Sequence, residues 1–252
     1  MSIAPPYEIR NNNYIIRLTK YNERYIIRAT EGEVYGKVKK TLYSLLLDED
    51  VVRAVDQLAH RRGCSRSALV NQLLAEQLDL MTPERRIAEV LRAMETLFQP
   101  DPDLVPMFSP NALSMSMKSA LDYKYRPTVK YEVELYRSGE NSIGALTVSY
   151  RTQSAELLAA MERFFSLWKQ LENAYLAPRL GHEIPSAIYD GRFVRSISVP
   201  GRECSAEELA EAISDYVHLF DKALKGCLSG RLSAADAEGL YAAHMKGSRL
   251  LI

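Results

Sequence analysis

The fold of this chain is decided by residues 40–80, which read KTLYSLLLDEDVVRAVDQLAHRRGCSRSALVNQLLAEQLDL. The apolar run Leu42–Leu47 is short and stops at Asp48, which is typical of a strand. Asp48 is also a good N-cap, so a helix is expected to begin there. Gly63 supplies the left-handed residue that ends this helix, and Ser65 caps a second one. The stretch therefore predicts a strand, a helix, a tight turn and a second helix.

Both predicted helices carry one apolar face, because apolar residues recur at intervals of three and four. The two faces consist of Val51, Val52, Val55, Leu58 and Ala59, and of Leu69, Val70, Leu73, Leu74 and Leu78. One strand of about six residues has no pairing partner for its backbone, and two short helices cannot supply one. A second copy of the chain would complete the ribbon, so we expect a homodimer or a higher even-numbered oligomer.

The segment 40–80 resembles the ribbon-helix-helix family of bacterial DNA-binding proteins, the class that includes the Arc and MetJ repressors. The resemblance rests on the strand, the apolar helix positions and the turn Arg61-Arg62-Gly63-Cys64-Ser65-Arg66-Ser67. It implies a dimer whose paired strands lie in the major groove of double-stranded DNA. Counting back from Gly63 places Leu42, Ser44 and Leu46 on the base-facing side, with Tyr43, Leu45 and Leu47 toward the helices. Leucine cannot hydrogen-bond a base edge, so this face departs from the family pattern.

In the same family the start of the second helix grips DNA phosphates, because free backbone N–H groups there attract anions. The expected phosphate contacts are Lys39, Lys40, Arg61, Arg62, Ser65, Arg66 and Ser67, with Lys37 nearby. The alternative is that Ser65 is only an N-cap and that the arginines are solvated. Residues 1–67 hold 12 Lys and Arg against 8 Asp and Glu, or +4, whereas residues 68–252 hold 20 against 24, or −4. The basic part of the chain thus coincides with the expected DNA contact.

Residues 1–13 are predicted to form an irregular arm, followed by the repeat YIIRLT at 14–19 and YIIRAT at 25–30. The five residues between the repeats suit a hairpin loop. Arg17 and Arg28 would share one side of this hairpin and serve as auxiliary DNA contacts, or simply form a solvated face. A third possibility is that the hairpin covers the leucine face of the central ribbon.

The rest of the chain predicts an α+β domain. A Thr82-Pro83 start indicates one more helix after the central motif, and four prolines in residues 99–110 indicate a linker, followed by a short helix near Asn111–Asp122. Two strand–strand–helix units follow, with helices that open on Ser154 and Ser205, and they could form one antiparallel sheet. We expect four parts: an arm and hairpin at 1–36, the ribbon-helix-helix module with its extra helix at 37–98, the linker with its short helix at 99–125 and the α+β domain at 126–252.

The sequence offers no catalytic constellation, no metal-ligand spacing and no cofactor motif, so we expect a protein that is not an enzyme and carries no cofactor. Three separated cysteines, no signal-peptide pattern and no apolar run long enough for a membrane span favour the cytoplasm. The expected function is a dimeric DNA-binding protein, either a transcriptional regulator such as a repressor or an accessory factor of a mobile element. An effector or protein partner is expected at the C-terminal domain. The alternative is an assembly factor that dimerises through the module and uses Leu42 and Leu46 to bind protein.

Overall fold

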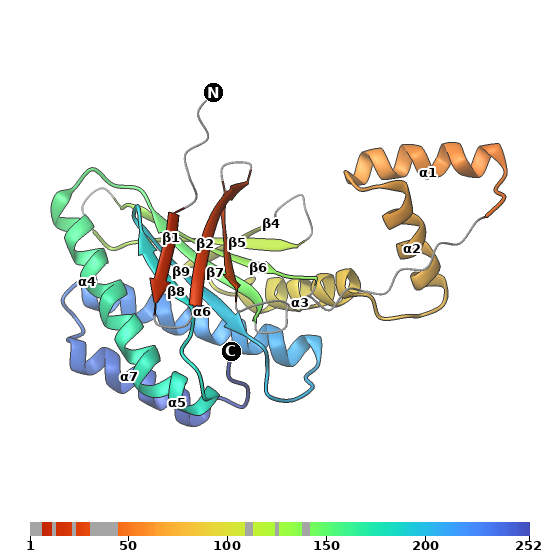
Figure 1. Ribbon diagram of the computed structural model, residues 1–252. Helices are drawn as coiled ribbons and strands as arrows, with labels where there is room; N and C mark the ends of the chain where they lie inside the picture. Colours follow the sequence, from red (N-terminus) through yellow and green to blue (C-terminus); the bar gives the residue numbers. More distant parts are fainter. Residues whose placement is uncertain are drawn as a thin grey trace. The chain divides into compact units, whose positions relative to one another are not determined.

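The computed structural model of the chain describes residues 7–11, 14–21, 24–30, 45–108, 113–123, 126–137 and 142–252, the first three ranges by their backbone. Contacts divide the chain into two compact units. The central unit is Gly36–Arg86, and the main unit comprises Met1–Tyr35 and Ile87–Ile252. The chain mixes helices and strands, as expected for an α+β protein (Figure 1).

Three antiparallel strands make a small sheet at the start of the chain, namely β1 (Tyr7–Asn11), β2 (Tyr14–Tyr21) and β3 (Arg24–Thr30). The irregular arm predicted for residues 1–13 is therefore wrong where β1 pairs with β2. The alternation in Tyr7-Glu8-Ile9-Arg10 is typical of a strand but is too short to stand out alone. In the β2–β3 hairpin, positions 17 and 28 are Cα partners, as the internal repeat suggests.

The main unit is built on a six-stranded antiparallel sheet in the order β4-β5-β6-β7-β9-β8. Its strands are β4 (Leu104–Phe108), β5 (Ser114–Ala120), β6 (Thr128–Leu135), β7 (Ser142–Tyr150), β8 (Ser186–Tyr189) and β9 (Arg192–Ser198). Neighbouring strands are consecutive in the chain except where β9 pairs with β7 and β8 forms the far edge. Along β6 every second residue is buried, so one face of the sheet carries core residues and the other is more open.

The predicted linker and short helix at 99–125 are wrong, because this segment contributes two strands to the sheet. Met115 and Met117 are fully buried while the intervening Ser116 is only half-buried, which is the two-residue period of a strand. Pro106 is tolerated in β4 because that strand is an edge of the sheet. The prolines therefore do not separate this segment from the sheet that follows.

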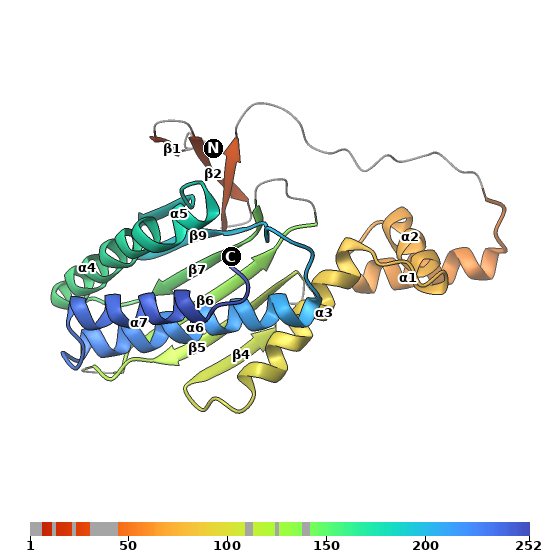
Figure 2. The same cartoon turned by 90° about the horizontal axis from the view of Figure 1, so that it is seen from below.

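Helices cover one face of this sheet (Figures 1 and 2). They are α4 (Ala155–Leu171), continued by the π-helical turn η1 (Glu172–Leu176) and by α5 (Ala177–Leu180), then α6 (Ala206–Leu228) and α7 (Ala234–Gly247). The caps follow local chemistry, because the hydroxyls of Ser154 and Ser205 accept hydrogen bonds from the third backbone N–H of α4 and α6. In chain order the elements run β6-β7-α4 and then β8-β9-α6.

The core between sheet and helices is aromatic, and Phe220 on α6 is its centre. The Phe220 ring contacts the rings of six neighbours: Tyr131, Phe164, Phe165, Trp168, Phe193 and Tyr216. Phe220 and Trp168 are both fully buried. Edge-to-face and offset contacts of this kind add to the stabilisation that comes from burial alone.

The third helix of the chain, α3 (Pro83–Phe98), begins as predicted, because the Thr82 hydroxyl accepts a hydrogen bond from the backbone N–H of Arg85. From Ile87 onward its apolar face joins the main core. At its end, the Phe98 ring stacks on the imidazole of His218 on α6, with centroids 4.6 Å apart. His218 Nε2 in turn lies 3.1 Å from a carboxylate oxygen of Asp101, so the end of α3 is tied to α6.

A buried ion pair lies between β9 and the π-helical turn. Arg195 Nε lies 3.3 Å from Oε1 of Glu172, and both side chains are almost completely buried. The Tyr216 hydroxyl donates to Glu172 at 2.6 Å, and Arg195 Nη2 donates to the backbone carbonyl of Ile252 at 2.6 Å. Trp168 Nε1 donates to the Tyr216 hydroxyl at 2.7 Å. The π-helical turn directs Glu172 inward, and such turns often occur at functional sites.

The pKa values in this cluster follow from burial and charge. Burial raises the pKa of the Glu172 carboxyl, against the opposing attraction of Arg195. Burial disfavours the charge on Arg195, but Glu172 overrides it and the pKa of the guanidinium is raised. Burial, and then the negative charge of Glu172, raises the pKa of the Tyr216 hydroxyl. Tyr216 therefore remains protonated and donates its hydrogen to Glu172.

The change Phe220→Ala is expected to lower the free energy of unfolding of the main unit by about 3–5 kcal/mol, because it leaves a cavity among six aromatic rings. Urea unfolding followed by Trp168 fluorescence measures this loss, since Trp168 lies against Phe220. Leu158→Ala, at a side chain that is 37% exposed, is the matched control and should change stability by no more than about 0.5 kcal/mol. Equal effects of the two changes would contradict this account of the core.

Candidate nucleic-acid interface

The central unit contains two helices joined by a glycine turn, α1 (Glu49–Arg62) and α2 (Arg66–Gln77). Gly63 adopts the left-handed conformation, with φ 62° and ψ 30°. The backbone N–H of Cys64 donates to Ala59 and that of Gly63 to His60, which is the Schellman pattern of helix ends. The turn therefore ends α1 and redirects the chain within three residues, as the sequence predicts.

Ser65 begins α2 as its N-cap, and its hydroxyl accepts a hydrogen bond from the backbone N–H of Ala68 at 3.2 Å. The N–H groups of Arg66 and Ser67 in the first turn have no hydrogen-bond partner among the described residues. They are free to bind an anion, because unsatisfied N–H groups and the helix dipole make such a site at a helix N-terminus. The expected anchoring role of Ser65 and Ser67 is therefore compatible with the geometry.

The arginines around this turn differ in their surroundings. Arg61 and Arg62 are exposed in the last turn of α1, where positive charge also favours the helix dipole. Arg66 is exposed too, but its guanidinium donates to the Asp56 carboxylate of α1 at 2.6 Å. Its charge is therefore partly compensated before any partner binds, and Arg61 and Arg62 are the freer cations.

The segment Leu45–Leu47 before α1 has no regular secondary structure in the single chain. Leu46 is fully exposed, and Leu45 and Leu47 are 52% and 48% exposed. The expectation that Leu45 and Leu47 face the helices concerns the paired ribbon and stays a prediction, and in the single chain Leu46 is the most exposed of the three. A strand that lacks its partner has no sheet to fix which side faces the core.

The described part of the central unit buries little apolar surface. Its buried apolar residues are Ala59, Leu69 and Ala75. Its exposed large apolar residues are Leu45, Leu46, Leu47, Val51, Val52, Leu74, Leu78, Leu80 and Met81. An apolar surface of this extent on so small a unit indicates an interaction site.

Several predicted contacts lie outside the described residues, namely Lys37, Lys39, Lys40, Leu42, Tyr43 and Ser44. Arg17 and Arg28 are described by their backbone alone, which places them opposite each other in β2 and β3. The proposed roles of these residues remain predictions.

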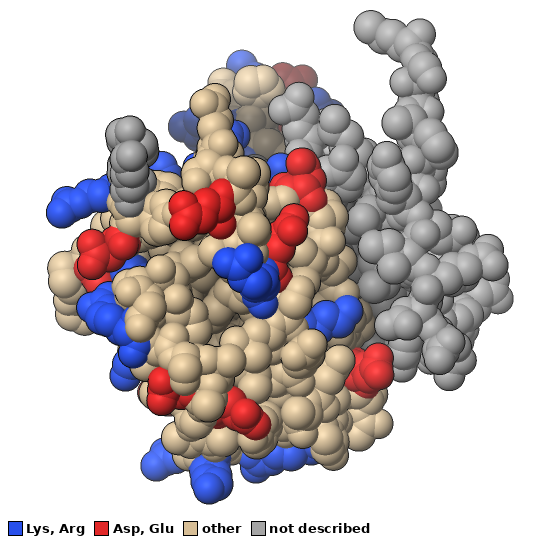
Figure 3. Space-filling view, turned by 90° about the vertical axis from the view of Figure 1, so that its left-hand side faces the viewer, with Lys and Arg blue, Asp and Glu red and all other residues tan. Residues whose placement is uncertain are grey.

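The surface of the main unit offers no comparable basic area on the face shown in Figure 3. Lys and Arg side chains are interspersed there with Asp and Glu among larger uncharged areas. A face of mixed sign does not attract a phosphate backbone as a continuous basic surface would. The candidate for nucleic-acid contact is the turn between α1 and α2, where Arg61 and Arg62 are exposed and the first N–H groups of α2 are free.

The central unit thus combines a leucine segment, a helix that ends at a left-handed glycine and a second helix capped by serine. Residues 44–80 match the model of the family described as ribbon-helix-helix protein, copG family. The match supports a DNA-binding module in this segment, and the family implies dimerisation. The region after residue 80 matches no family model. No curated protein and no solved structure matches the chain.

None of the described helices is both long enough and apolar enough to cross a bilayer. No group of three or more His, Cys, Asp or Glu side chains within the described ranges is arranged to hold a metal ion.

Sequence reasoning missed the buried pair of Glu172 and Arg195. Glu172 lies at the end of a long predicted helix, where a charged residue reads as surface. Arg195 lies between Phe193 and Ile197 on one face of an alternating strand. This alternation was the only feature of the sequence that indicated a buried position for Arg195. The extra residue of a π-helical turn cannot be read from a period of 3.6.

Gly63→Ala is expected to destabilise the α1–α2 hairpin by about 1 kcal/mol, because an L side chain is strained at positive φ. Hydrogen exchange of peptides that cover residues 49–77 measures the loss. Gly239→Ala, inside α7 with open space around the position, is the matched control and should stabilise its own helix by about 0.5–1 kcal/mol. Unchanged protection in the first variant would show that the left-handed turn does not hold the hairpin.

Proposed function

We propose that this protein is a homodimeric DNA-binding regulator, acting in transcription or as an accessory factor of a mobile element. Two central units pair their Leu42–Leu47 segments into one ribbon and grip DNA through the α1–α2 turn. The observation that carries the proposal is the family match at residues 44–80, joined to the free N–H groups of Arg66 and Ser67. The function is binding rather than catalysis.

The leucines at the base-facing positions favour contact with the DNA backbone over reading of base edges. Leucine at position 46 can touch a thymine methyl but cannot donate or accept a hydrogen bond. Contacts to phosphates from Arg61, Arg62 and the start of α2 position a protein without specifying sequence. We therefore expect affinity that depends strongly on salt and only weakly on sequence.

The double change Arg61→Ala and Arg62→Ala should weaken binding to a random DNA duplex and flatten its salt dependence. Each arginine that contacts a phosphate contributes about 0.9 to the slope of log affinity against log salt, and a dimer carries two copies. Fluorescence anisotropy over a salt series measures both effects. Arg163→Ala on the outer face of α4 is the matched control and should leave the slope unchanged. Absence of any binding by the unaltered protein at about 50 mM salt would refute DNA binding.

A second candidate function is favoured by the full exposure of Leu46. In this alternative the module serves dimerisation alone, and the leucine face binds another protein. Leu46→Glu separates the two functions. The first function is supported if the variant no longer binds DNA while sedimentation still shows a dimer. The second is supported if the variant loses a protein complex or its solubility while it still binds DNA.

A further inference from the structure

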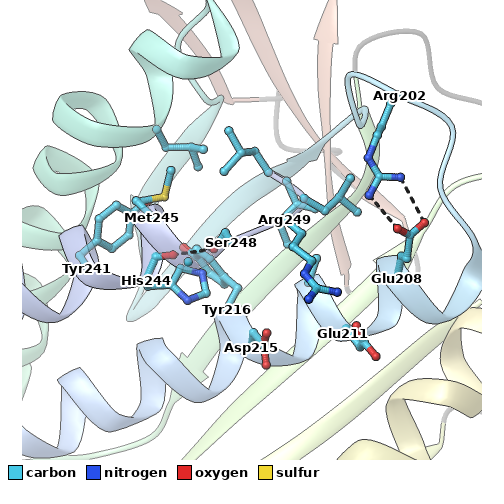
Figure 4. Close-up of a pocket in the computed structure, with 16 residues that line it drawn as sticks. Arg202, Glu208, Glu211, Asp215, Tyr216, Tyr241, His244, Met245, Ser248 and Arg249 are labelled. Carbon is cyan, nitrogen blue, oxygen red and sulfur yellow. Dashed lines mark hydrogen bonds and ion pairs between the residues drawn. The ribbon is translucent and has the colours of Figure 1, made fainter.

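A cavity of about 320 Å³ opens in the main unit between α6, α7 and the segment after α7 (Figure 4). Its apolar wall consists of Leu176, Met245, Leu250, Leu251 and the rings of Tyr216 and Tyr241. This volume is at the lower end of the range for small-molecule sites. It suits a ligand of about the size of an amino acid.

The inner wall of the cavity is polar and buried. Tyr216 lines it and connects directly to the Glu172–Arg195 pair behind it. Tyr241 also lines it, is 1% exposed, and its hydroxyl has no hydrogen-bond partner among the described residues. The hydroxyl itself is buried, so Tyr241 offers its ring rather than its hydroxyl to a molecule in the cavity.

The mouth of the cavity carries more negative than positive charge. Glu208, Glu211 and Asp215 lie on one face of α6, at helical spacing. Arg202 neutralises Glu208 through two hydrogen bonds of 2.7 and 3.2 Å. Glu211 and Asp215 have no ion-pair or hydrogen-bond partner within the described part of the chain, and only Arg249 extends toward them in Figure 4.

His244 adds no stable positive charge to this mouth. Burial lowers the pKa of its imidazole, against the opposing attraction of Asp215. Near neutral pH two carboxylates therefore face one guanidinium, and a cation that enters the cavity is attracted.

We propose that this cavity binds a small molecule that joins a protonated amine to an apolar or aromatic body. The amine pairs with Glu211 and Asp215, and the apolar body lies against Tyr216, Tyr241 and Met245. A carboxylate on the same molecule, as in an apolar amino acid, pairs with Arg249. The proposal concerns the main unit alone and does not depend on DNA binding.

Three probes that differ by one group test the site by isothermal titration of the full chain: phenethylamine, L-phenylalanine and 3-phenylpropionate. We expect the first two to bind and the third, which lacks the amine, to fail. Arg249→Ala distinguishes an amino-acid ligand from a plain amine. If the ligand is an amino acid, the change should weaken binding of phenylalanine about tenfold and leave binding of phenethylamine unchanged. Equal loss of both, or of neither, assigns the site to a plain amine.

Glu211→Gln and Asp215→Asn should each weaken binding of phenethylamine about tenfold, because each removes one charge-assisted contact. Glu162→Gln, at an exposed position of α4 outside the cavity, is the matched control and should bind as the unaltered protein does. Absence of binding by both amines at about 10 mM overturns the proposal, as does equal binding of 3-phenylpropionate. Thermal unfolding of each variant verifies that the fold is retained.

Discussion

The structure depends on one constraint, which is that Leu45–Leu47 of the central unit form no regular secondary structure and pack against no core among the described residues. Leu46 is fully exposed and Leu45 and Leu47 are half-exposed, so this segment has no core to lie against. Only Ala59, Leu69 and Ala75 are buried in the described helices of that unit. A backbone segment without pairing partners and a helical hairpin without a core both require a second surface. The proposed pairing of two copies provides both at once.

The main unit has the opposite character, since it buries a continuous core of its own. An antiparallel sheet supports a layer of helices, and the aromatic cluster around Phe220 joins them. This core also contains a buried charged pair, Glu172 and Arg195, at positions where apolar side chains could be buried without the cost of removing charges from water. Buried ion pairs contribute little net stability, so their retention requires another explanation. The proposed ligand site offers one, because Tyr216 lines that cavity and donates a hydrogen bond to Glu172.

Local chemistry was predictable from the sequence, whereas the placement of segments in the sheet was not. Gly63 ends α1 in the left-handed conformation, and Ser65 and Ser205 cap the N-termini of α2 and α6, as the sequence predicted. The segment Asn111–Asp122, which contains Met115, was predicted as a short helix after a proline-rich linker. It became β5 since two neighbouring strands could pair with it. Glu172 escaped prediction because one π-helical turn shifts the face on which it lies.

Exposure of the leucine segment has a consequence for how the protein would respond to its own abundance. With the proposed pairing, only the dimer binds DNA. While the chain concentration is below the dissociation constant of the dimer, the concentration of dimer rises with the square of the chain concentration. Halving the supply of chains would then reduce the competent form about fourfold. Such a protein would bind DNA little at low concentration, and its DNA binding would rise steeply as the chain concentration approaches the dissociation constant of the dimer.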